Sequence, residues 1–254
     1  MLDKDKHLKR FDDYASGYDL SDGRIKLKIL HTKEVCKVME KITDSMELPQ
    51  DTADLAWLCA LYHDVSRFEQ ITQFGTFIDA FSFDHGDAGC RIIDEGRFLE
   101  DQTEEDRQKV KSAIRYHNKY EIGPVGDAET MLLCKLIRDA DKCDIFRVFA
   151  CEDMVDTMGE TTDQVSREAI TDVVMESVLA HRCVVKEQRK TGLDKWIGFL
   201  GFIYDLNFPE SIRIVKEEGY YRRPFDETKF HDPETGRRVQ LILEDLEAYI
   251  SEGV

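Results

Sequence analysis

The spacing of apolar residues is the feature that most constrains the fold of this chain. Apolar side chains recur with a helical period along most of the 254 residues. Strict alternation, the pattern of a half-buried strand, is nearly absent. Only five prolines occur, so little interrupts the helical pattern. The sequence therefore predicts an all-α fold, a bundle of roughly eight to ten helices.

Amphipathic stripes and capping residues delimit the expected helices. The predicted segments are 22–42, 51–62, 84–94, 103–117, 130–150, 166–190, 195–218 and 238–250. The polar, turn-rich stretch 219–236 is expected to be a surface excursion. No linker, low-complexity run or fixed-period repeat marks a boundary, so we expect one domain over residues 1–254.

The charge balance restricts the class of partner. The net charge is −17, and such an acidic surface repels polyphosphate chains and anionic lipid headgroups. We therefore expect no long nucleic acid and no membrane as partner. A small phosphorylated substrate remains compatible, because a metal site can invert the local potential.

The N-terminus and the cysteines indicate a cytoplasmic protein. Residues 1–6 read Met-Leu-Asp-Lys-Asp-Lys and are not followed by an apolar signal core. The most apolar stretch, 196–206, is too short to span a bilayer. The seven cysteines form no C-x-x-C pair, which favours free thiols in a reducing compartment. The sequence leaves a homo-oligomer open.

Six side chains that could ligate a metal are distributed over the predicted helices of the N-terminal half. They are His31, His63, Asp64, His85, His117 and Asp141. Imidazole nitrogens and carboxylate oxygens are ligands of divalent first-row metals, and a helical bundle can assemble one site from several helices. Asp141 is in register with the apolar Ile137, and His117 with Ile114, so both are expected to point inward. A buried carboxylate needs a partner, and a metal is the usual one.

The order of these residues, with the phrases around them, resembles the HD superfamily of metal-dependent phosphohydrolases. The phrases are 29–35, 60–68, 84–86, 113–118 and 137–142. The resemblance implies a helical metal-binding core over about residues 25–146, with the helices of 147–254 packing on it. The Gly-Tyr-Pro motif of cyclic-di-GMP phosphodiesterases is absent, which argues against that branch.

The resemblance also implies how one or two divalent ions (Mn, Fe, Mg or Zn) would be held. One ion would take His31, His63, Asp64 and Asp141 as ligands. The other would take Asp64, His85 and His117, with Asp64 bridging. If His85 or His117 is not a ligand, the site would hold one ion and the remaining histidine would bind substrate.

Three further polar residues are candidates for substrate contact. Arg67 follows the His63-Asp64 pair by three residues, and its planar guanidinium could grip a phosphate or simply pair with a carboxylate. Lys142, directly after Asp141, allows the same two interpretations. We assign Asp64, Arg67 and Lys142 to the catalytic set. Asn118 could bind substrate or support His117.

The leading hypothesis from the sequence is hydrolysis of a small phosphorylated metabolite or nucleotide by metal-activated water. Two alternatives stay open. A branch of the HD superfamily uses a di-iron centre as an oxygenase, and its ligand set is similar. A regulatory nucleotide-binding module that keeps its metal ligands but has lost turnover is the other.

Overall fold

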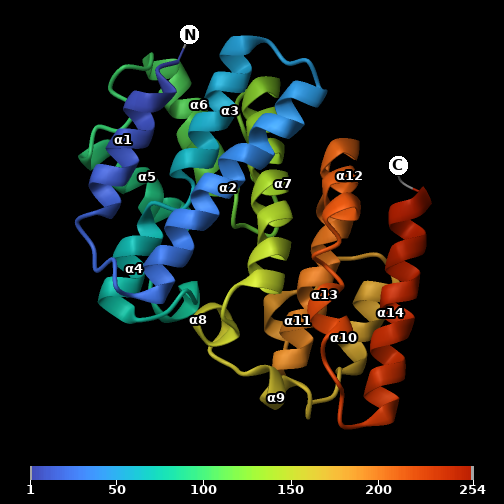
Figure 1. The fold of residues 1–254 in the computed structure, drawn as a ribbon. Helices are drawn as coiled ribbons and strands as arrows, with labels where there is room; N and C mark the ends of the chain where they lie inside the picture. The colour runs from blue at the N-terminus through green and yellow to red at the C-terminus, as the bar shows by residue number, and fades with distance from the viewer. Residues whose placement is uncertain (1, 253–254) are drawn as a thin grey trace. The chain divides into compact units, whose positions relative to one another are not determined.

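Every regular element that the structure describes is a helix. The computed structural model describes residues 2–252, and within that range it contains α-helices and short 3-10 helices but no strand (Figure 1). The predicted all-α fold class is therefore confirmed. Over the same range, no helix combines the length and the hydrophobicity that a membrane crossing requires.

The chain divides into two compact units, one ending at Asp141 and the other beginning at Lys142. Helix α7, Ala128–Cys151, passes from the first unit into the second. The division lies close to residue 146, where the sequence places the end of the metal-binding core. A single domain over the whole chain stays a prediction.

The first unit builds a bundle in which α2 packs on α3, α3 on α6, α6 on α5 and α5 on α4. Its elements before α7 are α1 Lys4–Ala15, α2 Gly23–Ser45, α3 Gln50–Tyr62, α4 Ser66–Phe74, η1 Asp79–Phe81, α5 His85–Glu95 and α6 Glu104–Tyr116. Asp22, Asp84 and Thr103 begin α2, α5 and α6 by accepting backbone N–H groups with their side chains. These three starts fall at or near the predicted positions.

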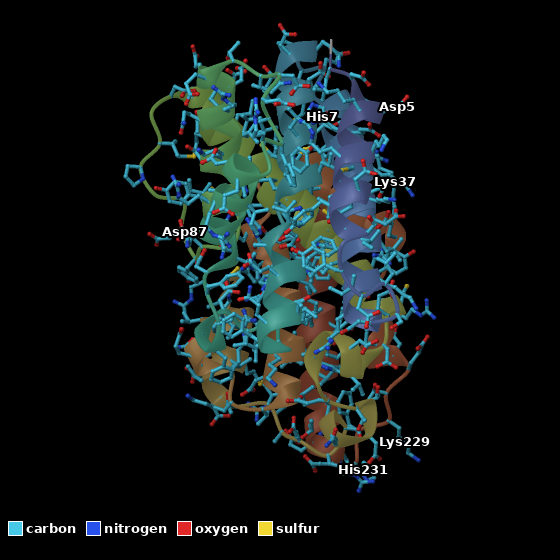
Figure 2. All side chains as sticks on the ribbon, turned by 90° about the vertical axis from the view of Figure 1, so that its left-hand side faces the viewer. Asp5, His7, Lys37, Asp87, Lys229 and His231 are labelled. Carbon is cyan, nitrogen blue, oxygen red and sulfur yellow. The ribbon has the colours of Figure 1, made fainter. Side chains whose placement is uncertain are left out.

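Helix α1 was not among the predicted helices, although it carries a helical apolar stripe. His7 is completely buried, as is Phe11, whereas Asp5 on the same helix is exposed. In the view of Figure 2, Asp5 and Lys37 lie at the edge of the molecule, whereas His7 lies within its outline. The His7 Nδ1 lies 2.9 Å from the Tyr62 hydroxyl on α3, so a buried hydrogen bond joins the two helices.

The second unit contains the C-terminal part of α7 and a series of shorter helices. They are α8 Met154–Met158, α9 Thr162–Val165, α10 Asp172–Leu179, η2 Lys186–Gln188, α11 Gly192–Leu200, η3 Gly201–Asp205, α12 Pro209–Glu218, α13 Arg223–Asp226 and α14 Pro233–Glu252. Helix α10 packs on α11 and on α14. None of the seven cysteines in the chain forms a disulfide bond.

Three sequence predictions in the second unit are wrong. The helix expected over 166–190 is broken, because Asp194 accepts the backbone N–H groups of Thr171 and Lys190 and so replaces helical hydrogen bonds. The helix over 195–218 is also broken: α11 ends at Leu200, η3 follows to Asp205, and α12 begins only at Pro209, whose ring favours the extended backbone seen at Phe208. The stretch 219–236 is no simple surface excursion, because it includes α13 with a buried Phe225.

Candidate metal centre

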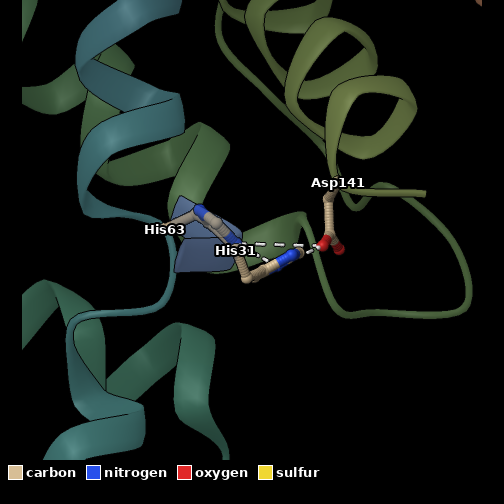
Figure 3. Close-up of side chains that lie close together, drawn as sticks. All are labelled: His31, His63 and Asp141. Atoms are coloured by element: carbon tan, nitrogen blue, oxygen red, sulfur yellow. Dashed lines mark hydrogen bonds and ion pairs between the residues drawn. The ribbon is translucent and has the colours of Figure 1, made fainter. Parts of the chain in front are cut away.

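One half of the centre is assembled from three separate places in the first unit. His31 lies within α2, His63 in the turn that follows α3, and Asp141 on α7. The His31 Nε2 is 3.1 Å from Asp141 Oδ1 and 3.3 Å from His63 Nε2 (Figure 3). These three atoms belong to one group that could hold a metal ion.

The other half is assembled where α5 begins and α6 ends. His85 is the first residue of α5 and His117 directly follows α6. Their Nε2 atoms lie 3.1 Å apart. Gly86 permits this approach, because a Cβ there would lie 2.7 Å from the Arg115 carbonyl oxygen and 2.7 Å from Asn118 Oδ1. A larger residue at position 86 would push α5 away from the end of α6.

Asp64 lies between the two halves, and each of its oxygens faces a different pair of histidines. Its Oδ2 is 3.6 Å from His31 Nε2 and 3.4 Å from His63 Nε2. Its Oδ1 is 3.7 Å from His85 Nε2 and 3.8 Å from His117 Nε2. A carboxylate placed in this way can donate one oxygen to each of two ions.

Three of the histidines have the ring orientation of a metal ligand. The Nδ1 of His63 lies 2.8 Å from the Ala60 carbonyl oxygen, and that of His117 lies 2.6 Å from the Ile114 carbonyl oxygen. His85 Nδ1 lies 2.6 Å from Asp79 Oδ2. The two carbonyl oxygens and the Asp79 carboxylate can only accept, so each of these contacts places a proton on Nδ1 and leaves Nε2 to face the cluster. At His85 the 2.6 Å contact with Asp79 is shorter than the 3.1 Å contact of the same Nδ1 with Asn118 Nδ2.

Burial and neighbouring charges shift the pKa values of two histidines and two carboxylates of the cluster. Burial lowers the pKa of His85, and burial together with His85 and His63 lowers the pKa of His117 to about 3. Burial works in the opposite direction on Asp64, but Lys28 and His63 hold the pKa of that carboxyl well below its usual range. For Asp141, the hydrogen bond from His31 and the neighbouring histidines likewise outweigh burial and lower the pKa.

These donors fit a divalent metal. Ligand atoms bound at right angles through bonds of about 2.1 Å lie about 3 Å apart. The closest approaches in the two halves, 3.1 Å between His31 and Asp141 and 3.1 Å between His85 and His117, match this spacing. The Arg67 Nη2 lies 3.2 Å from the His85 Nε2, so a guanidinium N–H faces this ring atom. All six residues expected from the sequence come together.

Two cations border the cluster, and the sequence predicted only one of them. The Lys28 Nζ is 2.6 Å from Asp64 Oδ2, and the Arg67 Nε is 3.4 Å from Asp64 Oδ1. Lys28 and Arg67 also lie over the same ring, that of Phe77. Lys28 is one helical turn before His31, so the shared face of α2 is the signal that could have found it.

Asn118 and Lys142 are placed differently from one another. The Asn118 Nδ2 donates to Asp79 Oδ2 at 3.2 Å and lies 3.1 Å from His85 Nδ1. Asn118 therefore contacts His85 and its partner Asp79. One interpretation of the sequence had expected it to support His117 instead. Lys142 is the first residue of the second unit, and its ammonium pairs with Asp205 Oδ2 at 2.8 Å. A catalytic or substrate-binding role for Lys142 stays a prediction.

Comparison with known proteins identifies one family. Residues 29–145 match the model of the family described as the HD domain. The matched range includes all six residues of the cluster. No curated protein and no solved structure matches the chain.

Proposed function

Residues 29–145 of the chain form an HD domain, and on that premise we propose that the protein hydrolyses a small phosphorylated metabolite or nucleotide. The HD domain places the chain in a superfamily of metal-dependent phosphohydrolases. The identity of the domain thus supports hydrolysis as the reaction class, and the substrate class is our inference from the residues around the cluster.

The position of Asp64 is the observation that carries the proposal. Its two oxygens face the His31–His63 pair and the His85–His117 pair, respectively. In this proposal His31, His63, Asp64 and Asp141 hold one ion, and Asp64, His85 and His117 hold the other. When bound, the ions would lower the pKa of a water molecule and offset charge on the phosphate oxygens.

The protein's own contribution is to orient the donors and to bind the phosphate. Fixed Nδ1–H groups on His63, His85 and His117 keep their Nε2 lone pairs directed into the cluster without reorganisation. Among the described residues, the buried Arg67 Nε makes no hydrogen bond, and it lies at an ion-pair distance of 3.4 Å from Asp64 Oδ1. We infer that this N–H donates to a non-bridging oxygen of the substrate. The Lys28 ammonium, with three donors, can hold Asp64 and a second phosphate oxygen together.

A small substrate suits the electrostatics better than a polymer. A net charge of −17 repels an extended polyanion. Beside the cluster, in contrast, Lys28 and Arg67 supply local positive charge. One phosphoryl group can be neutralised there without contact to the acidic surface. We therefore place the substrate among phosphate monoesters and nucleotides.

The test combines metal analysis with a phosphatase screen. Protein purified without chelator would be analysed for Mn, Fe, Mg and Zn and then assayed for phosphate release from a panel of small phosphoesters. We expect metal-dependent release that Asp64→Ala abolishes while the far-ultraviolet circular dichroism stays helical. Asp87→Asn, a change at an exposed carboxylate on α5, is the matched control and should retain activity.

Two results would replace the proposal. Oxygen consumption by an iron-loaded protein, without phosphate release, would assign the oxygenase reaction instead. Calorimetric binding of a nucleotide by the metal-loaded protein, with no phosphate released from any member of the panel, would make it a regulatory module. Phosphate release that is equal in the wild type and in Asp64→Ala would remove the metal centre from the reaction.

A further inference from the structure

Asp79 connects two parts of the centre with one carboxylate. It lies on η1, outside the six expected ligands. Its Oδ2 is 2.6 Å from His85 Nδ1. Its Oδ1 accepts from Arg67 Nη1 at 3.0 Å. One oxygen therefore fixes a metal-binding histidine, and the other fixes the guanidinium assigned to the phosphate.

Two amide side chains from different parts of the first unit donate to this carboxylate. Gln70, on α4, donates from Nε2 to Asp79 Oδ1 at 3.0 Å and to Ser82 Oγ at 2.7 Å. Asn118, just beyond α6, donates to Asp79 Oδ2 at 3.2 Å. The same segment also offers the Phe77 carbonyl oxygen to Arg67 Nη1 at 2.7 Å. Hydrogen bonds thus connect residues 77–82 to α4, through Arg67 and Gln70, and to the His85–Asn118 side of the centre.

The chemistry of this arrangement gives Asp79 a specific effect. A carboxylate that accepts from the Nδ1–H of a histidine fixes the ring and increases the basicity of Nε2. The effect acts on His85, whereas the Nδ1 atoms of His63 and His117 contact backbone carbonyl oxygens. The half of the centre that contains His31 and Asp141 does not depend on this carboxylate.

We propose that Asp79 is a positioning residue that couples the binding of the second ion to the grip of Arg67 on the phosphate. The proposal rests on the proposed function for the identity of the anion. Loss of the Asp79 charge should weaken the second ion and the substrate together, and leave the first ion in place.

The location of Asp79 makes a purely structural role a poor explanation. Its side chain is 20% exposed, and the neighbouring Ile78 and Phe81 are 52% and 73% exposed. None of the residues of η1 is buried. A change at this position therefore removes little from the core and should leave the helical frame intact.

Asp79→Asn is the test, because His85 and Arg67 contact different oxygens of Asp79, and in asparagine one of these two positions becomes an NH2 group that can only donate. The metal-free full-length protein would be titrated with Mn²⁺ and followed by electron paramagnetic resonance and calorimetry. We expect the first ion to bind as in the wild type and the Kd of the second to rise about 10–100-fold. The KM for the best phosphoester should rise as well. Thr76→Ala, in the same exposed segment, is the control and should bind both ions normally.

Three outcomes would overturn the proposal: wild-type affinity for both ions in Asp79→Asn, an equal loss of both ions with a lowered melting temperature, or a wild type that binds only one ion. The metal titration needs no turnover. If the wild type released no phosphate from any substrate, the proposed function would fail while the selective effect of Asp79→Asn on the second ion could still be present.

Discussion

Asp64 is a charged carboxylate with only 3% of its side chain exposed, and Lys28 is its nearest cation. Burial of an isolated charge is costly, so Asp64 depends on positive charge close by. The ammonium at 2.6 Å and the guanidinium at 3.4 Å supply this charge in the metal-free protein. A divalent ion would take over part of that role and also compete with Lys28 for Asp64 Oδ2.

Lys28→Met should therefore change metal binding and catalysis in opposite directions. Removal of a competing positive charge should lower the Kd for Mn²⁺. The same change removes a charge-assisted hydrogen bond to the phosphate, so kcat/KM for the best phosphoester should fall about tenfold or more. Calorimetry and steady-state kinetics measure the two effects. Lys26→Met, on the exposed face of the same helix, should alter neither, and weaker metal binding in Lys28→Met would contradict this account.

The expected metal ligands could be predicted from the sequence. The residue that orients one of them by a hydrogen bond, Asp79, could not. His63-Asp64 and Asp141 are recognisable from the residue types, the helical register and the resemblance of the local phrases. Asp79 has no such signal, because it lies in a short 3-10 segment whose spacing from His85 follows no helical period. Its role depends on a tertiary contact that only the structure reveals.

At the scale of elements, the junction between α5 and α6 sets the geometry of the second half of the centre. Gly86 lies directly against two backbone carbonyl oxygens. A Cβ at this position would lie 2.7 Å from the Arg115 carbonyl oxygen and 3.0 Å from the Ile114 carbonyl oxygen. Backbone atoms cannot move aside as a flexible side chain can. The distance between the His85 and His117 Nε2 atoms therefore depends on the absence of a side chain at this position.

Gly86→Ala should separate α5 from α6 and weaken the second ion. We expect a loss of about 1–3 kcal/mol in the free energy of unfolding from overpacking, and loss of the second Mn²⁺ in a titration. Gly89→Ala on the same helix is a matched control, because its Cβ would first meet the Ile114 side chain at 3.4 Å. This control should bind both ions and gain up to about 1 kcal/mol from helix propensity. Two ions bound normally by Gly86→Ala would refute the steric role of the glycine.

The elements themselves were predicted best where helical periodicity and a capping residue coincide, as at Asp22 and Asp84. Prediction failed in the second unit where tertiary contacts compete with local preference. Asp194 draws backbone N–H groups away from helical hydrogen bonds, and that competition depends on residues distant in the sequence. The break at Pro209, in contrast, had a local signal in the proline itself.

At the scale of the whole molecule, buried histidines link folding stability to pH. Burial lowers the pKa of His7 in the folded protein, and Asp101 only partly opposes this. The unfolded chain therefore binds a proton at a higher pH than the folded chain does. The contribution of neutral His7 to stability is complete above the unfolded pKa of about 6.5 and is lost as the pH falls below it.

His7→Asn should reduce this pH dependence. Asparagine can retain a hydrogen bond to the Tyr62 hydroxyl but does not titrate. Urea unfolding of the metal-free proteins at about pH 7.5 and about pH 5.5 measures the effect, and the wild type should lose more stability between the two conditions. The other histidines contribute equally to both proteins and cancel in the comparison. Equal losses in both would exclude His7 as a source of the pH dependence.

Anomalous diffraction from crystals grown with Mn²⁺ tests most directly whether Asp64 bridges two ions in the first unit. We predict two peaks on opposite sides of the Asp64 carboxylate. One should be bound by His31, His63 and Asp141, and the other by His85 and His117. A single peak, or a peak that does not contact Asp64, would contradict this bridging role.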